Sequence, residues 1–231
     1  MLSNKITLLI VGIALLLINA NLQAQPIQSG FITRPVVPNL FQVELVVFEH
    51  LTPSAEKQAW PAQVNLPSAK DAIELKTLAA NGIAPQLYQL LPSQYFKLNH
   101  EANLLAKQSD YKIILHIAWL QPLTAPNEAK PIHIYGGQSL DNQGGTLWQI
   151  NGLIKLSRDD FINLKTNLIL SESNNNLPSD LINDSNATVQ MYELKELRRL
   201  KPNELNYLDH PLFGVLIKII PLGGVSQQRS L

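Results

Sequence analysis

Polar side chains of several chemical types gather near the end of the chain, between residues 197 and 221. They are Arg198, Arg199, Glu204, Tyr207, Asp209 and His210. A carboxylate beside an imidazole can transfer protons as a general acid or base. A pair of guanidinium groups can hold a carboxylate or a phosphate through forked hydrogen bonds. This segment is therefore the first candidate for a surface that recognises a ligand or catalyses a reaction.

Catalysis by this segment has a structural alternative. Glu204, Asp209 and His210 could serve as acid, base and orienting group, but the sequence contains no Gly-x-Ser-x-Gly elbow and no cysteine nucleophile. In the alternative, Asp209 fixes a turn. Glu204 then pairs with Arg198 or Arg199 at an exposed strand end, where ion pairs contribute little to stability. We therefore favour a binding role and predict that the protein is not an enzyme.

The histidines and glycines give no support to a metal site or a phosphate site. None of the 5 histidines belongs to a His-x-His or His-Glu-x-x-His pattern, and the chain has no cysteine. His116 lies in an apolar run, which favours a buried core residue. The glycine pairs at 136–137, 144–145 and 223–224 are typical of turns. We predict that the protein uses no metal and no cofactor.

Three tryptophans could pack against sugar rings, because an aromatic face offers apolar contact and an indole also carries a polar edge. They are Trp60, Trp119 and Trp148. For Trp119 and Trp148, packing within the protein core is the alternative. The sequence alone leaves both interpretations open.

The first 24 residues have the pattern of a secretory signal. Lys5 is followed by an apolar run from Ile6 to Ile18, and Ala24 supplies a small residue for cleavage. The run of about 13 residues is too short to span a bilayer as a helix, although an uncleaved anchor is the alternative. A secreted chain without cysteine must hold its core by packing alone, which suits a bacterial periplasm. We therefore predict a periplasmic protein without a membrane span after cleavage.

Length and charge favour one large domain that does not bind nucleic acid. Removal of residues 1–24 leaves about 207 residues, a length that fits a single domain. The full chain has 18 basic and 18 acidic residues, so loss of Lys5 leaves 17 basic and 18 acidic residues. A nucleic-acid-binding surface needs a basic excess. We predict a flexible leader at 25–40, a single domain at 41–222 and a C-terminal tail at 223–231.

The hydrophobic patterns predict strands and helices within that domain. Residues 41–49 alternate and are apolar on both faces, which indicates a central strand. Ser68 and Asp71 resemble a capping box that opens a helix ending at Asn81–Gly82, and Asn99 is expected to cap a second helix that extends to Lys107. Further strands are predicted at 111–120, 131–135, 147–156, 161–170, 188–200 and 215–220.

Short links between the strands after residue 110 predict an antiparallel meander. The turn at 158–160 in particular makes 147–156 and 161–170 a hairpin. Together with the two predicted helices and the first strand, this pattern predicts an α+β class. The expected architecture is a curved antiparallel sheet with helices packed on one face.

Five pieces of the sequence occur in an order that resembles one protein family. They are residues 42–49, 116–122, 150–156, 198–199 and 204–214. The pattern is similar to that of the CsiV family, periplasmic peptidoglycan-binding proteins of gammaproteobacteria. The most specific piece is 204–214, and the pieces together extend over most of the chain except 51–90 and 171–187.

The resemblance implies a non-enzymatic protein that binds peptidoglycan and supports cell-wall assembly. It implies as partners a penicillin-binding protein synthase and the outer-membrane lipoprotein that activates this synthase. With the residues above, it gives a candidate site for peptidoglycan or for a partner. The candidate residues are Trp119, Gln121, Arg198, Arg199, Glu204, Tyr207, Asp209 and His210.

Two other functions remain open from the sequence. One is a protein-interaction module without direct glycan binding, with a sheet edge or the final hairpin as its interface. The other is a cell-wall hydrolase that uses Glu204 and Asp209.

Overall fold

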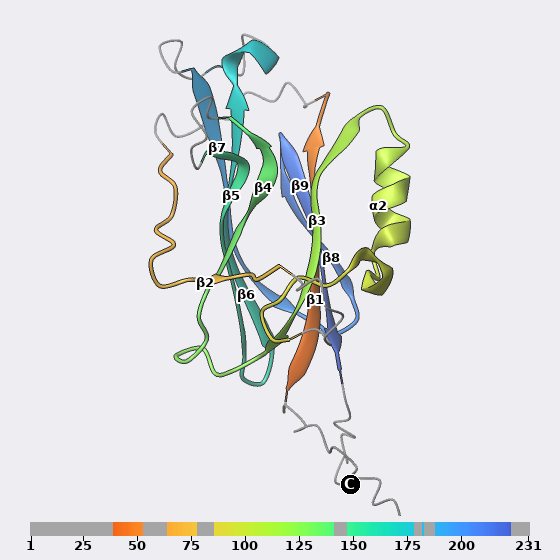
Figure 1. The fold of residues 1–231 in the computed structure, drawn as a ribbon, viewed down its shortest axis with the longest axis vertical. Helices are drawn as coiled ribbons and strands as arrows, with labels where there is room; N and C mark the ends of the chain where they lie inside the picture. Colours follow the sequence, from red (N-terminus) through yellow and green to blue (C-terminus); the bar gives the residue numbers. More distant parts are fainter. Residues whose placement is uncertain are drawn as a thin grey trace, which may run out of the picture. The chain divides into compact units, whose positions relative to one another are not determined.

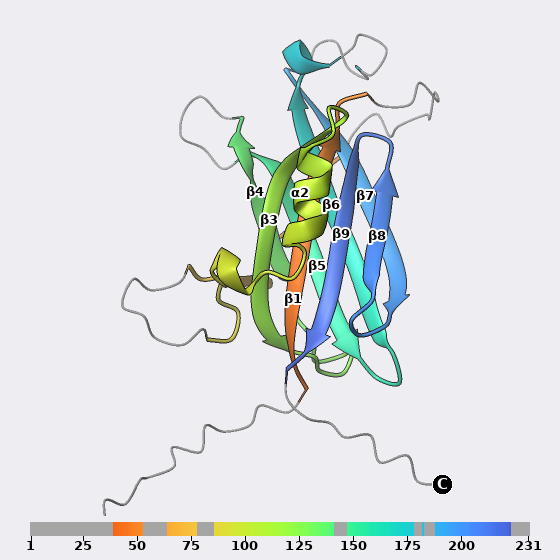
Figure 2. The same ribbon diagram turned by 90° about the vertical axis from the view of Figure 1, so that its right-hand side faces the viewer.

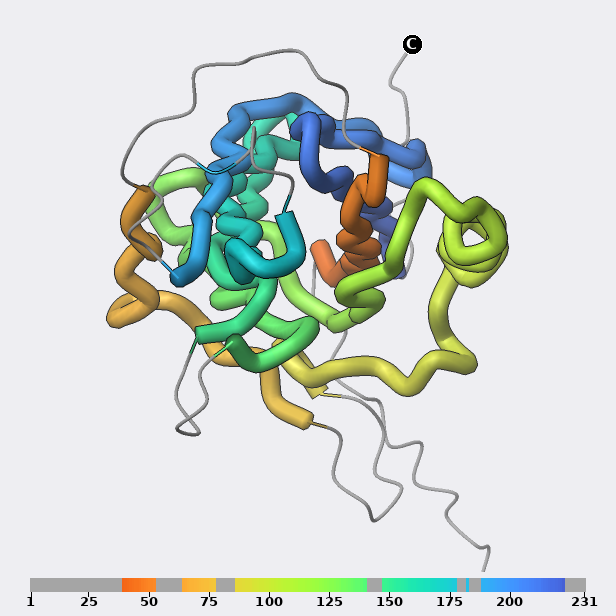
Figure 3. The backbone as a smooth tube through the Cα atoms, turned by 90° about the horizontal axis from the view of Figure 1, so that it is seen from above, coloured from red at the N-terminus to blue at the C-terminus, as the bar shows by residue number. Residues whose placement is uncertain are grey.

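The described part of the chain forms two β-sheets that face each other, with one α-helix on the outside (Figures 1 and 3). The computed structural model describes residues 39–52, 64–77, 86–140, 147–177, 182 and 188–222. Sheet A contains, in spatial order, β3 (Tyr111–Pro122), β1 (Leu40–His50), β9 (Phe213–Pro221) and β8 (Leu205–His210). Sheet B contains, in spatial order, β2 (Ile73–Glu74), β4 (Ile132–Ser139), β5 (Trp148–Arg158), β6 (Ile162–Ser173) and β7 (Val189–Leu200).

The predicted α+β class, one curved sheet with helices on a face, is wrong. The structure is mostly strand, and its core lies between two sheets. Side chains alternate along the strands, so each sheet presents apolar side chains to the other sheet, and these facing surfaces bury each other. Full burial of each large aliphatic side chain stabilises the fold by about 1.5–3 kcal/mol. The fully buried members of this core include Leu45, Trp119, Ile134, Ile154, Leu168, Tyr192 and Phe213.

The strand predicted at 41–49 is confirmed as β1, and it is central as expected. It pairs antiparallel with β3 on one side and with β9 on the other. Val43 and Leu45 face the core between the sheets, whereas Val46 and Phe48 belong to a second apolar cluster on the opposite face. Both faces are covered, which explains why apolar residues occur on both faces of the strand.

The chain does not form one continuous meander after residue 110. Strands β4, β5, β6 and β7 do follow one another as antiparallel neighbours, but β3 belongs to sheet A. The turn after β7, where Asn203 has φ 64° and donates its N–H to the carbonyl of Ile219 at 2.8 Å, carries the chain from sheet B back to sheet A. A short link cannot show whether the next strand stays in its sheet or crosses to the other one.

One predicted helix is confirmed and the other is not. The second helix is α2 (Asn99–Ala106), although Leu98 rather than Asn99 is its N-cap residue. The described part of the first predicted helix, 68–77, forms a turn and β2, and Ile73 donates to the carbonyl of Pro131 at 2.8 Å. Pairing with β4 has overridden the local capping pattern.

No helix in the described ranges is long and apolar enough to cross a membrane.

The predicted signal peptide, the leader up to residue 38 and the tail at 223–231 lie outside the described residues. Trp60 lies outside them as well.

Helix α2 is attached to the outer face of sheet A, over β3 and β1 (Figure 2). Leu98 and Ala102 pack there against Val46, Phe48 and Leu216. This small apolar cluster covers the side of β1 that faces away from the main core.

A buried carboxylate holds the start of the helix. Glu44 is completely enclosed and accepts hydrogen bonds from the backbone N–H groups of Lys97 at 2.6 Å and Leu98 at 2.8 Å. Its Oε1 also lies 2.8 Å from Nε2 of His116, which is therefore a satisfied histidine of the sheet. Burial by itself raises the pKa of Glu44, but the hydrogen bonds from His116, Lys97 and Leu98 outweigh it and hold this pKa below the ordinary 4.5.

We expect Glu44→Gln to lower the free energy of unfolding at pH 7 by about 2–3 kcal/mol, because hydrogen bonds to a buried charged acceptor are lost. The measurement is urea denaturation followed by circular dichroism. Because the folded pKa lies below 4.5, the carboxylate stabilises the wild type above that pH, and this stabilisation is lost as the pH falls through the folded pKa. Glu204→Gln, which removes an exposed ion pair, is the control. Equal stability of wild type and Glu44→Gln at pH 7 would contradict the prediction.

Candidate functional site

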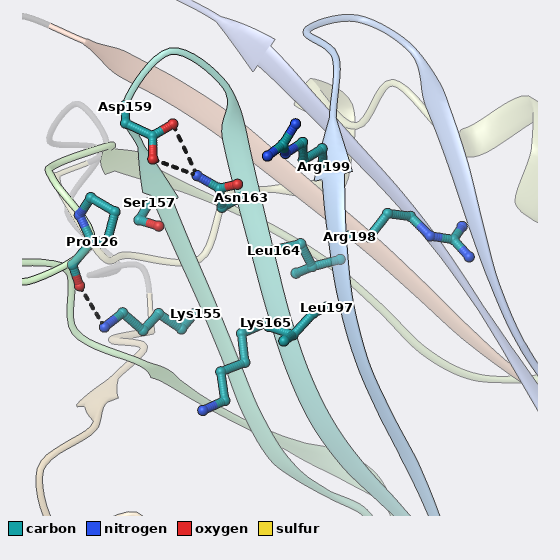
Figure 4. Close-up of a pocket in the computed structure, with 10 residues that line it drawn as sticks. All are labelled: Pro126, Lys155, Ser157, Asp159, Asn163, Leu164, Lys165, Leu197, Arg198 and Arg199. Carbon is teal, nitrogen blue, oxygen red and sulfur yellow. Dashed lines mark hydrogen bonds between the residues drawn. The ribbon is translucent and has the colours of Figure 1, made fainter.

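The outer face of sheet B carries two rows of side chains that cross β5, β6 and β7. Residues that alternate along these strands point away from the core, and the antiparallel register sets them side by side. The first row contains Lys155, Lys165 and Leu197, and the second contains Ser157, Asn163 and Arg199. The two rows form the floor of an open groove of about 560 Å³ (Figure 4). We call it the cationic groove; Pro126, Asp159, Leu164 and Arg198 complete its lining.

Three cationic side chains give the groove its charge. Lys155 donates from Nζ to the carbonyl oxygen of Pro126 at 2.8 Å, and the Arg199 guanidinium lies 4.7 Å from the centroid of the Phe161 ring. With Lys165, these residues contribute three positive charges against the single carboxylate of Asp159, a formal excess of two; Arg198 also lines the groove, but its charge is paired with that of Glu196. The groove therefore attracts anions.

The carboxylate of Asp159 makes hydrogen bonds within the turn between β5 and β6. Its carboxylate accepts from the Phe161 N–H at 2.9 Å and from Nδ2 of Asn163 at 3.2 Å. The backbone hydrogen bond from Phe161, then that from Asn163 and the charge of Arg199 hold the pKa of Asp159 below its ordinary value, in spite of a smaller opposing effect of desolvation. The carboxylate is therefore ionised at neutral pH, and it orients Asn163 and the turn.

Apolar side chains border the same cations. Leu197 is 78% exposed and Phe161 is 52% exposed, large values for side chains of this size. A ligand that carries both carboxylates and aliphatic groups could bind the cations and cover these two side chains at once. Of the described residues that line the groove, none is a histidine and Asp159 is the one carboxylate. The arrangement is therefore suited to recognition rather than to proton transfer.

The two candidate arginines point in different directions. Arg199 is exposed and lines the groove. The guanidinium of Arg198 points away from Lys155 and Lys165 (Figure 4). It pairs with Glu196 and donates to the carbonyl oxygen of Tyr207, so it ties β7 to β8 across the gap between the sheets.

The polar residues of β8 and of the turn before it do not line the cationic groove. Glu204 pairs with Lys201 at 3.3 Å and not with an arginine. The hydroxyl of Tyr207 donates to Asp209, and its ring stacks on Phe48, with 6.1 Å between centroids. Burial and the neighbouring Asp209 carboxylate raise the pKa of Tyr207. Tyr207 and Asp209 therefore belong to the outer face of sheet A.

The remaining candidate residues, Trp119, Gln121 and His210, are buried. Trp119 is completely buried, and its indole N–H donates to Oε1 of Gln121 at 2.7 Å, so the two side chains satisfy each other inside the core. His210 is 5% exposed, and its Nδ1 accepts from the N–H of Leu212 at 3.2 Å. Burial lowers the pKa of His210 to about 4, although the charge of Asp209 opposes this effect. The structure thus divides the eight candidates among the groove, the outer face of sheet A, a turn and the core.

Sequence reasoning did not select Lys155, Lys165 or Asn163. The signal was present, because the predicted hairpin and its short turn imply which residues of the two strands face each other. Lys155 and Lys165 are direct partners in that register. Among the described residues there is no group of three histidine, aspartate or glutamate side chains that could hold a metal ion.

Comparison with known proteins identifies the family. The family model described as "Peptidoglycan-binding protein, CsiV" matches residues 8–222. This match extends over most of the chain, so the protein belongs to the CsiV family, which confirms the resemblance of its sequence pieces. No curated protein and no solved structure matches the chain.

We expect the stability of the wild type to fall as the pH drops from 6.5 to about 4, partly because of His210. In this range the unfolded state binds a proton at the imidazole and the folded state does not, which lowers the free energy of unfolding by up to about 1.4 kcal/mol per pH unit. His210→Asn should reduce the pH dependence in urea denaturation experiments. Substitution of the exposed His100 by Asn is the control, and an unchanged slope in His210→Asn would refute the prediction.

Proposed function

We propose that this member of the CsiV family binds peptidoglycan through the cationic groove of sheet B. The single observation that carries the proposal is the register that places Lys155, Lys165 and Arg199 together with exposed Leu197. The stem peptides of peptidoglycan carry free carboxylates next to aliphatic side chains. Lysine and arginine bind carboxylates by charge-assisted hydrogen bonds, and Leu197 offers apolar contact.

We propose that this binding is non-enzymatic. The groove is lined by cations, and its one carboxylate, Asp159, is held by Phe161 and Asn163. The two carboxylates that a hydrolase would need are engaged separately, Glu204 with Lys201 and Asp209 with Tyr207. These pairings favour a binding protein over a cell-wall hydrolase.

The cell envelope is the expected location for a member of a peptidoglycan-binding family. We propose the periplasm in particular, and the predicted signal at residues 1–24 supports this location. We also propose that the bound protein assists a penicillin-binding protein synthase together with its outer-membrane lipoprotein activator. The family resemblance motivates this partner.

The outer face of sheet A offers a surface for such a protein partner. Strand β8 is an edge of sheet A, and it exposes Leu205 and Tyr207 to 45% and 42%. An edge strand can accept a further strand from another protein. Glycan binding on sheet B and partner binding at β8 would then use different surfaces.

Sedimentation with peptidoglycan sacculi tests the proposal. We expect the wild type to sediment with sacculi, and Lys155→Gln/Lys165→Gln to bind at least about tenfold more weakly, which corresponds to about 1.4 kcal/mol. The matched control is Lys97→Gln/Lys107→Gln, which makes the same change of charge at exposed positions near α2. Circular dichroism verifies folding of each variant. A wild type that stays in the supernatant, or equal weakening by both double variants, would refute the proposal.

The two neighbouring arginines should separate binding from stability. Arg199→Ala removes a cation from the groove, so we expect about tenfold weaker binding to sacculi with little change in stability. Arg198→Ala breaks the link to Tyr207 and Glu196, so we expect the free energy of unfolding to fall by about 1 kcal/mol with near-normal binding. Sedimentation and urea denaturation of both variants measure the two effects. Normal binding by Arg199→Ala together with weakened binding by Arg198→Ala would place the ligand on the other face of β7.

A further inference from the structure

A second hollow lies on the same outer face of sheet B, beside strand β4. Its volume is about 680 Å³, and Leu66, Glu74, His133, Tyr135, Trp148 and Asn151 are among the residues that line it. It is separate from the cationic groove, since the two have no lining residue in common.

Aromatic rings form one wall of this hollow. Tyr135 is 42% exposed, and its ring centroid lies 5.8 Å from that of Trp148 and 4.9 Å from that of His133. The rings of His133 and Trp148 are inclined to that of Tyr135 by 40° and 39°, and all three residues line the hollow. An exposed aromatic ring offers apolar contact to the C–H face of a pyranose ring.

Polar groups of the same hollow are held together by hydrogen bonds. Nδ1 of His133 lies 2.6 Å from a carboxylate oxygen of Glu74, and Nε2 lies 2.9 Å from Oδ1 of Asn151. Carboxylate, imidazole and carboxamide provide hydrogen-bond donors and acceptors beside an apolar surface. Hydroxyl and acetamido groups of a sugar need both. This combination of a concave, aromatic wall and a few oriented polar groups is typical of small-ligand sites.

We propose that this hollow is a glycan subsite that takes an N-acetylhexosamine ring of a peptidoglycan strand. The inference rests on the proposed function and adds to it a separate place for the sugar. Asn151 at the hollow and Lys155 in the cationic groove lie four residues apart on β5. At about 3.4 Å per residue they are separated by about 14 Å along the strand, a distance that a sugar and its attached peptide can span.

Peptide-free ligands distinguish this subsite from the cationic groove. The probe is an N-acetylglucosamine tetramer, titrated by isothermal calorimetry, and the same proteins are sedimented with sacculi. We expect wild type and Lys155→Gln/Lys165→Gln to bind the tetramer within about twofold of each other, because the tetramer carries no carboxylate for the two lysines to bind. Tyr135→Ala should bind it at least about tenfold more weakly. Tyr135→Phe should bind normally, because the ring face makes the contact.

Exposed Tyr95, which lies outside the hollow, supplies the matched control Tyr95→Ala. The inference is overturned if the wild type binds sacculi but not the tetramer, or if Tyr135→Ala binds the tetramer as well as Tyr95→Ala does. If the wild type binds neither the tetramer nor sacculi, the proposed function fails together with the subsite.

Discussion

The alternation of side chains along β5, β6 and β7 is the constraint on which the candidate site depends. One face of these strands must be apolar, because it packs against sheet A around residues such as Ile154 and Leu168. The other face is then free to carry polar groups, and the register lines them up across three strands. The burial of Ile154 and Leu156 therefore orients Lys155 toward the groove. The hydrophobic core positions the charges.

The outer face of sheet A is covered by a helix and that of sheet B is not, for a physical reason. On sheet A, Val46 and Phe48 are apolar and are covered by α2, whose start is held by the buried carboxylate of Glu44. On sheet B, the outward residues of β5 to β7 at the groove are polar or charged except for Leu197, and no described helix packs on them. A face that needs no cover is available to a ligand. The same face holds the cationic groove and the aromatic hollow, so one glycan strand with its peptides could contact both.

The polar cluster near the end of the chain shows why neighbours in sequence need not form a site. Arg198 and Arg199 are consecutive, yet a strand points them to opposite faces. Tyr207 and Asp209 share a face, but His210 lies between the sheets. The sequence pattern predicts no strand at residues 205–210, and without this strand the polar residues of the final segment resemble a single surface. Once Leu205–His210 is a strand, alternation separates the residues.

The sequence by itself determined most of the strands, helix α2 and the family, because these depend on local periodicity and on ordered motifs. It also contained the register of the β5–β6 hairpin, since a short turn leaves little choice. Tertiary structure alone decided that β3 and β4 belong to different sheets, and that residues 73–74 form a strand instead of a helix. These outcomes depend on contacts between distant segments, whose burial outweighs local propensity. For the same reason the groove, which joins Lys155 to Arg199 across three strands, exists only in the folded protein.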